Sequence, residues 1–208
     1  MAKIVYLANS FKRGGRCIAG IDLETNRWIR PIGGGYEGAI RSERLINGAE
    51  PKLLDIIEIP LGGNANDLGC QPENRILRPG PWLKVGEIQK DNVLQYIEKT
   101  NRLLHNFDKN VPLSEFVSNI PKTEWKSLQL IPATNACFSK NPWNKTKTEC
   151  NLFYSGHWYL LPAPCPEAEQ NIGSKADYVL TISLGGPFRR KQQDDLCCWK
   201  MVAGVIKL

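Results

Sequence analysis

The sequence predicts a mainly β fold built from small barrels. Many short segments of strand length are separated by clusters of proline and glycine. One segment alone, 91–104, has the clear apolar periodicity of a helix. A chain of 208 residues is long enough for one large β unit or for two small domains with cores of their own. Many short strands with one good helix are typical of small β-barrels.

The N-terminal residues predict three strands separated by two turns. The Gly14-Gly15 pair predicts the first turn, because glycine adopts positive φ at little cost. Pro31 ends the third strand, since proline cannot donate to a β ladder. The period of two places Trp28 and Arg30 on the same face of that strand. The three strands are expected at 3–8, 16–21 and 27–30.

The rest of the chain continues as short strands, interrupted by the helix. Asp91 can cap this helix and Glu98 can pair with Arg102 on its surface. A shorter helical piece is expected at 113–117. Further strands are expected at 53–61, 70–77, 127–131, 136–139, 149–154, 157–161, 178–183 and 199–206. The expected division is a first barrel with its C-terminal helix at 1–107, a connector at 108–126 and a second barrel at 127–208.

Positive charge gathers at the N-terminus. The first 32 residues hold six basic and two acidic side chains, which gives them +4 of the chain's formal net charge of +6. Basic residues beside an aromatic ring on a β scaffold are typical of a surface that contacts phosphate and stacks a base. Alternatively, Trp28 belongs to the core and the arginines only solubilise an edge strand. The expected ligand-binding residues are Asn9, Ser10, Lys12, Arg13, Arg16, Trp28 and Arg30.

Two further polar segments are candidates for ligand contact. Gln71, Glu73 and Asn74 could read a base, or could fix a turn through their own backbone. If their loop folds toward the N-terminal strands, both sets would form one pocket. Arg189 and Arg190 follow a glycine turn and are expected as a secondary phosphate contact, unless this charged loop is only solvated.

The chain has no constellation that predicts catalysis, a metal or a cofactor. Cys137, Cys150, His157 and Cys165 are separated by irregular gaps, whereas structural zinc sites use closely spaced pairs. Nucleophilic catalysis needs a base beside the nucleophile, and the chain has only two histidines. The G-x-G-x-x-G match at 33–38 lacks the strand and helix of a dinucleotide site. Seven cysteines without regular spacing are typical of reduced thiols.

No secretory signal and no membrane span is expected. The N-terminus lacks an apolar h-region, and no apolar run approaches the roughly 20 residues that a spanning helix needs. The sequence therefore predicts a cytoplasmic location.

The order of motifs along nearly the whole chain resembles the dual OB-containing domain proteins of bacteria. The similar segments are LANS at 7–10, GGRCIAG at 14–20, WIRP at 28–31, DIIEIPL at 55–61, QPEN at 71–74, FYSG at 153–156, LTISLGGPF at 180–188 and KMVAGVI at 200–206. The resemblance implies two OB-type barrels. It also implies binding of nucleic acid or nucleotides in association with bacterial conflict and defence systems.

The sequence thus predicts non-catalytic binding of a nucleic acid or a nucleotide-like ligand. Single strands are preferred, because OB faces suit unpaired bases and the net charge is small for extensive duplex contact. The alternatives are a sensor of a small nucleotide, an enzyme acting on one, and a protein-interaction adaptor. Among these, nucleic-acid binding predicts an affinity that falls steeply with salt.

Overall fold

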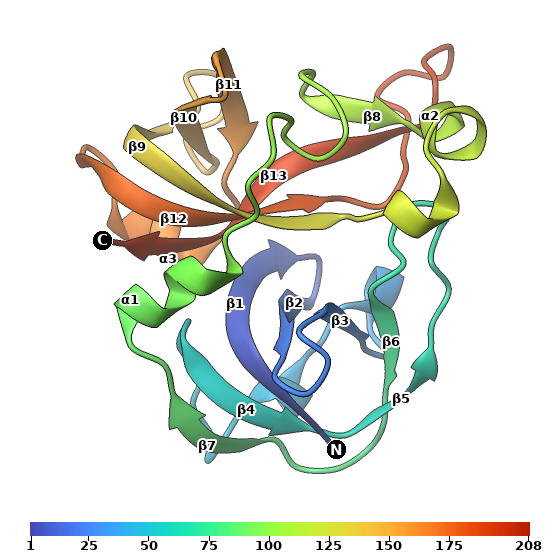
Figure 1. The fold of residues 1–208 in the computed structure, drawn as a ribbon, viewed down its shortest axis with the longest axis vertical. Helices are drawn as coiled ribbons and strands as arrows, with labels where there is room; N and C mark the ends of the chain where they lie inside the picture. Colours follow the sequence, from blue (N-terminus) through green and yellow to red (C-terminus); the bar gives the residue numbers. More distant parts are fainter. The chain divides into compact units, whose positions relative to one another are not determined.

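A computed structural model describes all 208 residues and confirms a mainly β fold with two barrel-like sheets (Figure 1). The chain divides into two compact units. The first comprises Met1–Ala65 and Glu73–Tyr96, and the second comprises Asn66–Pro72 and Ile97–Leu208. The division differs from the expected one, since the segment 108–126, expected as a connector, belongs to the second unit.

The first unit contains one seven-stranded sheet in the order β5-β6-β3-β2-β1-β4-β7. Within it, β1 pairs antiparallel with both β2 and β4, and β7 pairs with β4. At the other edge of the sheet, β6 pairs parallel with β3 and β5 follows β6. The strands are β1 (Ala2–Lys12), β2 (Gly15–Asp22), β3 (Trp28–Ile32), β4 (Asp55–Ile59), β5 (Leu61–Asn64), β6 (Asn74–Leu77) and β7 (Leu83–Glu87).

The second unit contains a six-stranded sheet in the order β11-β10-β9-β12-β13-β8. Its first five strands repeat the order of β3-β2-β1-β4-β7 in the first unit. The sheet also curls, because β11 approaches β13. Such a five-stranded, partly open barrel is the OB architecture. The strands are β8 (Asn110–Pro112), β9 (Leu128–Lys140), β10 (Thr148–Tyr154), β11 (His157–Pro162), β12 (Lys175–Leu184) and β13 (Cys197–Lys207).

Helical segments are few and short. The α-helices are α1 (Lys90–Val93), α2 (Leu113–Ser118) and α3 (Pro166–Gln170), and the 3-10 turns are η1 (Tyr36–Gly38), η2 (Ser42–Arg44), η3 (Leu94–Tyr96) and η4 (Lys122–Glu124). The short helical piece expected at 113–117 is confirmed as α2. No helix of the chain has both the length and the apolar character that crossing a bilayer requires.

The long helix expected at 91–104 is wrong from Ile97 onward. Its backbone groups find other partners: the Thr100 carbonyl accepts from Tyr154 Oη at 2.7 Å, and the Leu104 N–H donates to Gln129 Oε1 at 2.8 Å. In an α-helix those two backbone groups would bond to each other. Glu98 likewise pairs with Lys126 rather than with Arg102.

Each unit has its own hydrophobic core. The first is centred on isoleucines of β1, β2 and β4, with Tyr6 and Trp82. The second gathers residues from every strand of β8–β13, including Phe138, Leu152 and Tyr159. Burying each large apolar side chain stabilises a fold by about 1.5–3 kcal/mol. On β1 both faces are shielded from solvent, because Val5 and its neighbours on the opposite face from Tyr6 are also fully buried.

Candidate functional site

Two glycines shape the tip of the β1–β2 hairpin. Gly14 has φ +75°, and the turn therefore uses the left-handed backbone that glycine tolerates. A side chain on Gly15 would lie 2.3 Å from the Ile40 carbonyl oxygen, so a glycine is needed for the close approach of that segment. Arg16 and Ile40 exchange two backbone hydrogen bonds, of 2.8 and 2.9 Å. These bonds hold the segment 36–44 against the hairpin tip.

Exposed aromatic rings lie beside arginines where these two segments join. Phe11 is 51% exposed and Tyr36 is 53% exposed. The Arg16 guanidinium lies 4.0 Å from the centre of the Phe11 ring, and the Arg13 guanidinium lies 5.2 Å from that of Tyr36. Lys12 Nζ donates to the Glu37 carbonyl. We call this region the hairpin surface; it consists of Phe11, Lys12, Arg13, Arg16, Tyr36 and Arg44.

Glu50 forms ion pairs with two of these arginines, Arg16 and Arg44. Arg44 Nη2 lies 2.6 Å from Glu50 Oε1, and Arg16 Nη2 lies 3.2 Å from Glu50 Oε2. Asn9 Nδ2 donates to the same Oε2 at 3.2 Å. Burial alone would raise the pKa of Glu50, but the hydrogen bonds from Arg44 and Asn9 and the two guanidinium charges lower it. The carboxylate is therefore ionised at neutral pH.

The hairpin surface carries a net positive charge despite Glu50. The segments 11–16 and 36–50 together contain five basic and three acidic residues. Phe11, Arg13 and Tyr36 are exposed, as are the acidic residues Glu37 and Glu43, whereas Glu50 is engaged with Arg16 and Arg44. This balance suits an anionic ligand with planar groups.

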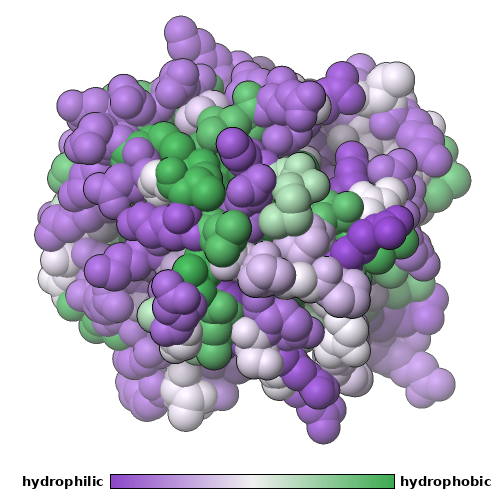
Figure 2. Space-filling model, turned by 90° about the horizontal axis from the view of Figure 1, so that it is seen from below, coloured by the Kyte–Doolittle hydropathy of each residue, from purple (hydrophilic) through white to green (hydrophobic).

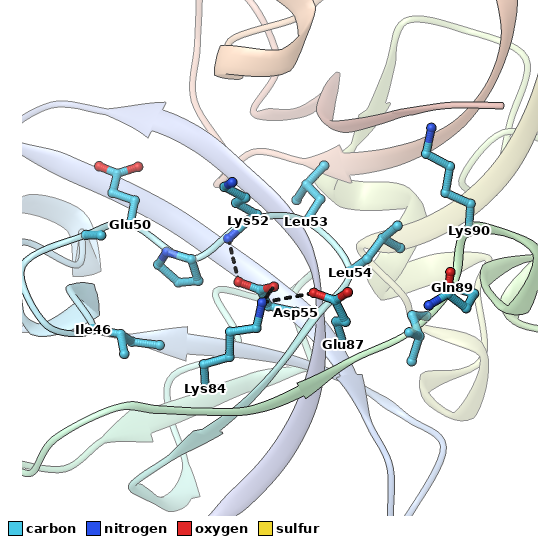
Figure 3. A pocket seen from close by; sticks show the side chains of 13 residues that line it. Ile46, Glu50, Lys52, Leu53, Leu54, Asp55, Lys84, Glu87, Gln89 and Lys90 are labelled. Carbon is cyan, nitrogen blue, oxygen red and sulfur yellow. Dashed lines mark hydrogen bonds and ion pairs between the residues drawn. The ribbon is translucent and has the colours of Figure 1, made fainter.

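A cavity of about 460 Å³ lies beside Glu50 in the same unit (Figure 3). Lys84 Nζ lies within it at 2.6 Å from Asp55 Oδ1 and 3.1 Å from Glu87 Oε2, which raises the pKa of the lysine. Figure 3 shows Glu50 apart from that group, with no interaction joining them. The charged residues that line the cavity are three acidic and three lysine side chains, Glu50, Asp55, Glu87, Lys52, Lys84 and Lys90. Its charge is thus balanced and does not select a polyanion.

The structure separates the predicted N-terminal residues into two groups. Lys12, Arg13 and Arg16 lie on the hairpin surface. Asn9 and Ser10 lie beneath it and are 3% and 4% exposed, with Ser10 Oγ near the Cys17 carbonyl. The sequence did not indicate Phe11, Tyr36, Arg44 or Glu50 as members of one site.

Arg30 is buried, although the sequence placed it with Trp28 on one exposed face of the third strand. It is 2% exposed, although period two does place it on the same face of β3 as the half-buried Trp28. Its N–H donates to the Glu73 carbonyl at 2.9 Å, and it is the register partner of Asn74 in the β3–β6 ladder. An arginine is buried only when other groups compensate its charge, so this residue contributes to the fold.

The polar segment 71–74 divides between the two units. Gln71 belongs to the second unit, where its Nε2 donates to the Leu184 carbonyl at 2.9 Å, and it is 5% exposed. Glu73 and Asn74 belong to the first unit and are also buried. All three side chains are thus shielded from solvent in this structure.

Arg189 and Arg190 lie on the exposed loop between β12 and β13. Arg189 Nε donates to the Asp194 carbonyl at 2.9 Å, which closes the loop on itself. Arg190 lies 3.4 Å from the centre of the Trp199 ring, with Phe188 nearby. The loop therefore repeats the arrangement of an arginine over an aromatic ring.

An exposed aromatic pair on β10 and β11 was not indicated by the sequence. Phe153 and Trp158 are cross-strand partners whose ring centres lie 5.2 Å apart, and they are 46% and 69% exposed. These strands take the second and third positions of an OB barrel, which often bind ligands. The only signal in the sequence was alternation along 149–154.

All seven cysteines are free thiols. No three side chains among His, Cys, Asp and Glu are grouped to hold a metal ion. Burial raises the pKa of Cys150 to about 12, so its thiol stays protonated at neutral pH. His157 stacks on Phe107 with ring centres 4.1 Å apart.

The face of the molecule drawn in Figure 2 is mainly hydrophilic. Hydrophobic residues show on it as separate islands among polar side chains. Singly exposed apolar residues of this kind are ordinary on soluble surfaces.

Comparison with known proteins identifies a family. The model of the dual OB-containing domain family matches residues 2–205. No curated protein and no solved structure matches the chain. Because the match spans almost all of the chain, and because both units have the same five-strand order, the protein belongs to the dual OB-containing domain family.

Proposed function

We propose that the protein binds single-stranded nucleic acid through the hairpin surface of its first unit. The observation that carries this proposal is the pairing of two half-exposed aromatic rings, Phe11 and Tyr36, with two arginines. Proteins that bind single strands combine aromatic rings for base stacking with basic groups along the backbone. Membership of a dual OB family supports a binding role, since OB barrels are common oligonucleotide binders.

The geometry suits unpaired bases better than a duplex. An arginine stacked on an aromatic ring presents a flat guanidinium, on which a base can stack while the N–H groups reach phosphate. A B-form duplex would instead require a long row of phosphate contacts. The chain's net charge of +6 is modest for such a row. Single strands are therefore the preferred ligand.

Removing one exposed arginine from the hairpin surface tests the proposal. Arg13→Ala leaves Tyr36 without its stacked cation and removes one charge, so affinity for a labelled 15-nucleotide deoxythymidylate strand should fall in fluorescence anisotropy. The slope of log affinity against log salt should become shallower by about 0.7, the value for one phosphate that is no longer neutralised.

Arg27→Ala is the matched control. Arg27 is also exposed, but it lies in the turn between β2 and β3, at the opposite end of β2. The substitution Arg27→Ala removes the same charge as Arg13→Ala but leaves the hairpin surface unchanged. Equal losses for both variants would mean that net charge alone attracts the strand, and this would contradict the proposal.

The cavity beside Glu50 favours a small nucleotide as the second candidate ligand. Its volume of about 460 Å³ lies in the range of small-molecule sites. Its charges are balanced and no aromatic side chain lines it, so it ranks below the hairpin surface. Saturable binding of a mononucleotide that is insensitive to salt and unaffected by Arg13→Ala would favour this second candidate.

The cellular setting is also a proposal. Resemblance to bacterial dual OB-containing proteins suggests a cytoplasmic role in conflict or defence. Deletion in a host that carries the protein should then change its resistance to phage or mobile elements. Unchanged resistance in such a strain counts against this setting, but not against binding of single strands.

A further inference from the structure

We propose that Arg16, Arg44 and Asn9 form a phosphate subsite which Glu50 occupies in the free protein. This inference rests on the proposed function and names the part of the hairpin surface that receives a backbone phosphate. The Glu50 carboxylate, with its two anionic oxygens, stands in for two oxygens of a phosphodiester.

The geometry around Glu50 is that of an anion site. Its Oε1 accepts from Arg44 Nε at 3.1 Å and from Arg44 Nη2 at 2.6 Å. Its Oε2 lies 3.2 Å from Arg16 Nη2 and accepts from Asn9 Nδ2 at the same distance. Two guanidinium groups and one amide thus converge on a single carboxylate. Planar guanidinium groups of this kind can donate to two oxygens of a phosphate, as they do to those of a carboxylate.

Two buried polar atoms at the site have no partner. Asn9 Oδ1 and Arg16 Nη1 are shielded from solvent and make no hydrogen bond. Asn9 as a whole is only 3% exposed. Buried polar groups are otherwise satisfied in nearly all native structures. Of these two atoms, Arg16 Nη1 is a donor that Glu50 leaves unused. A ligand with more oxygens, such as phosphate, could accept from Arg16 Nη1 as well.

Two members of the subsite, Arg16 and Asn9, are held in place by β1 and β2. Arg16 is fixed by its contact with the Phe11 ring, 4.0 Å away, and by its backbone pairing with Ile40. Asn9 lies on β1, opposite Ile18 of β2. Glu50 lies outside any strand or helix, in the connection that leads to β4. Arg16 and Asn9 thus belong to paired strands, whereas Arg44 and Glu50 both lie in the connection between β3 and β4. In the proposal, the Glu50 carboxylate is the group that a phosphate displaces.

Displacing Glu50 exchanges one anion for another at the same arginines. The surface thereby keeps its buried cations neutralised when no ligand is bound. The carboxylate also competes with weak anions, because its pKa is lowered and it stays charged at neutral pH. A strand that binds must contribute stacking on Phe11 or Tyr36 in addition to its phosphate.

Neutralising Glu50 tests this assignment. Glu50→Gln keeps the shape of the side chain and removes its charge, so Arg16 and Arg44 become available to phosphate. Affinity for the 15-nucleotide deoxythymidylate strand should rise by about threefold or more, in keeping with the loss of one ion pair. The salt slope should steepen by about 0.7 for each additional phosphate that the arginines neutralise.

Glu98→Gln is the control. The Glu98 side chain is 29% exposed, the same as that of Glu50, and it is likewise paired, 2.5 Å from Lys126. It loses the same charge but does not touch Arg16 or Arg44. Its affinity should rise much less than that of Glu50→Gln, and an equal rise would overturn the assignment.

A second readout separates the subsite from the proposed function. Inorganic phosphate, added to Glu50→Gln at low ionic strength, should shift the Nε–Hε resonances of Arg16 and Arg44. If these resonances shift while no strand binds, the phosphate subsite is supported and the proposal of nucleic-acid binding is rejected. If strands bind but these resonances do not respond to phosphate and the affinity is unchanged, the subsite is overturned. Should Glu50→Gln fail to fold, Arg44→Ala in the otherwise wild-type protein must flatten the salt slope by about 0.7; an unchanged slope rejects the subsite.

Discussion

At the scale of single residues, we propose that the aromatic rings of the hairpin surface select which kind of anion binds. Arginines alone would accept any phosphate, whereas an exposed ring selects a ligand that also has a flat face. Tyr36 is held by the segment that pairs with Arg16, and its ring is 53% exposed beneath Arg13. The residue thus lies beside a cation and is about half open to solvent.

Replacing Tyr36 measures the stacking contribution. Tyr36→Ala should weaken binding of a deoxythymidylate strand by about 1–3 kcal/mol, the usual range for one base on an aromatic ring. Tyr36→Phe keeps the ring and should bind within about threefold of wild type, since only a hydroxyl is lost. Equal weakening by both variants, in anisotropy titrations at one salt concentration, would show that the ring does not stack a base.

A buried lysine makes the stability of the second unit depend on pH. Lys200 is 1% exposed, and burial lowers its pKa to about 7 against the opposing charge of Asp108. Its Nζ donates to the carbonyl oxygen and to Oδ1 of Asn106, both at 2.7 Å. Because the folded pKa lies below the unfolded value, the unfolded chain binds more protons between about pH 7 and pH 10. Stability should therefore rise with pH across this window.

Lys200→Met removes the titrating group. The free energy of unfolding in urea, compared between wild type and variant, should favour wild type increasingly from pH 7 to pH 9.5. The change should be at most about 1.4 kcal/mol per pH unit. Parallel profiles for the two proteins would mean that Lys200 keeps an ordinary pKa.

At the scale of strands and helices, much of the architecture was predictable. The apolar runs and glycine turns of 3–8, 16–21 and 27–30 correspond to β1, β2 and β3. Strands that are very short or exposed were missed, and β7 is the clearest example, because four of its five residues are exposed. Periodicity cannot detect a strand that buries neither face.

The failed part of the predicted helix has a local cause that the sequence could not reveal. Thr100 and Leu104 carry the spacing of a helical pair, but Tyr154 and Gln129 from distant strands take their backbone groups. The burial of Arg30 escaped the sequence for a similar reason. Period two placed Arg30 beside Trp28, but it could not say that their face of β3 is covered. Phe11 and Tyr36 lie 25 positions apart, and their segments are joined by the backbone pairing of Arg16 with Ile40.

Close contact between β1 and β2 gives a prediction about this sheet. A methyl group on Gly20 would lie 2.2 Å from the Val5 carbonyl oxygen. Gly20→Ala should therefore lower the free energy of unfolding by about 1–3 kcal/mol, as overpacking usually does. Gly34→Ala is the control, because no atom lies within 4 Å of the added methyl group, and its effect should stay within about 0.5 kcal/mol. Similar stabilities for the two variants in urea unfolding would contradict the observed strand spacing.

At the scale of the whole molecule, two units share one five-strand order but expose different groups. The first offers basic and aromatic side chains at the tip of β1 and β2. The second offers the pair Phe153 and Trp158 on β10 and β11, with fewer charges around it. A shared fold therefore does not imply a shared binding face. Function has to be assigned to the surface, unit by unit.

Mapping a bound strand onto the backbone amides tests most directly whether the hairpin surface is the binding site. A deoxythymidylate strand is titrated into isotopically labelled protein, and amide chemical shifts are followed by NMR. If the strand binds at the hairpin surface, the largest shifts lie in the segments 11–16 and 36–50. Saturation without shifts in these segments, or shifts confined to the strands around Phe153 and Trp158, would contradict this assignment.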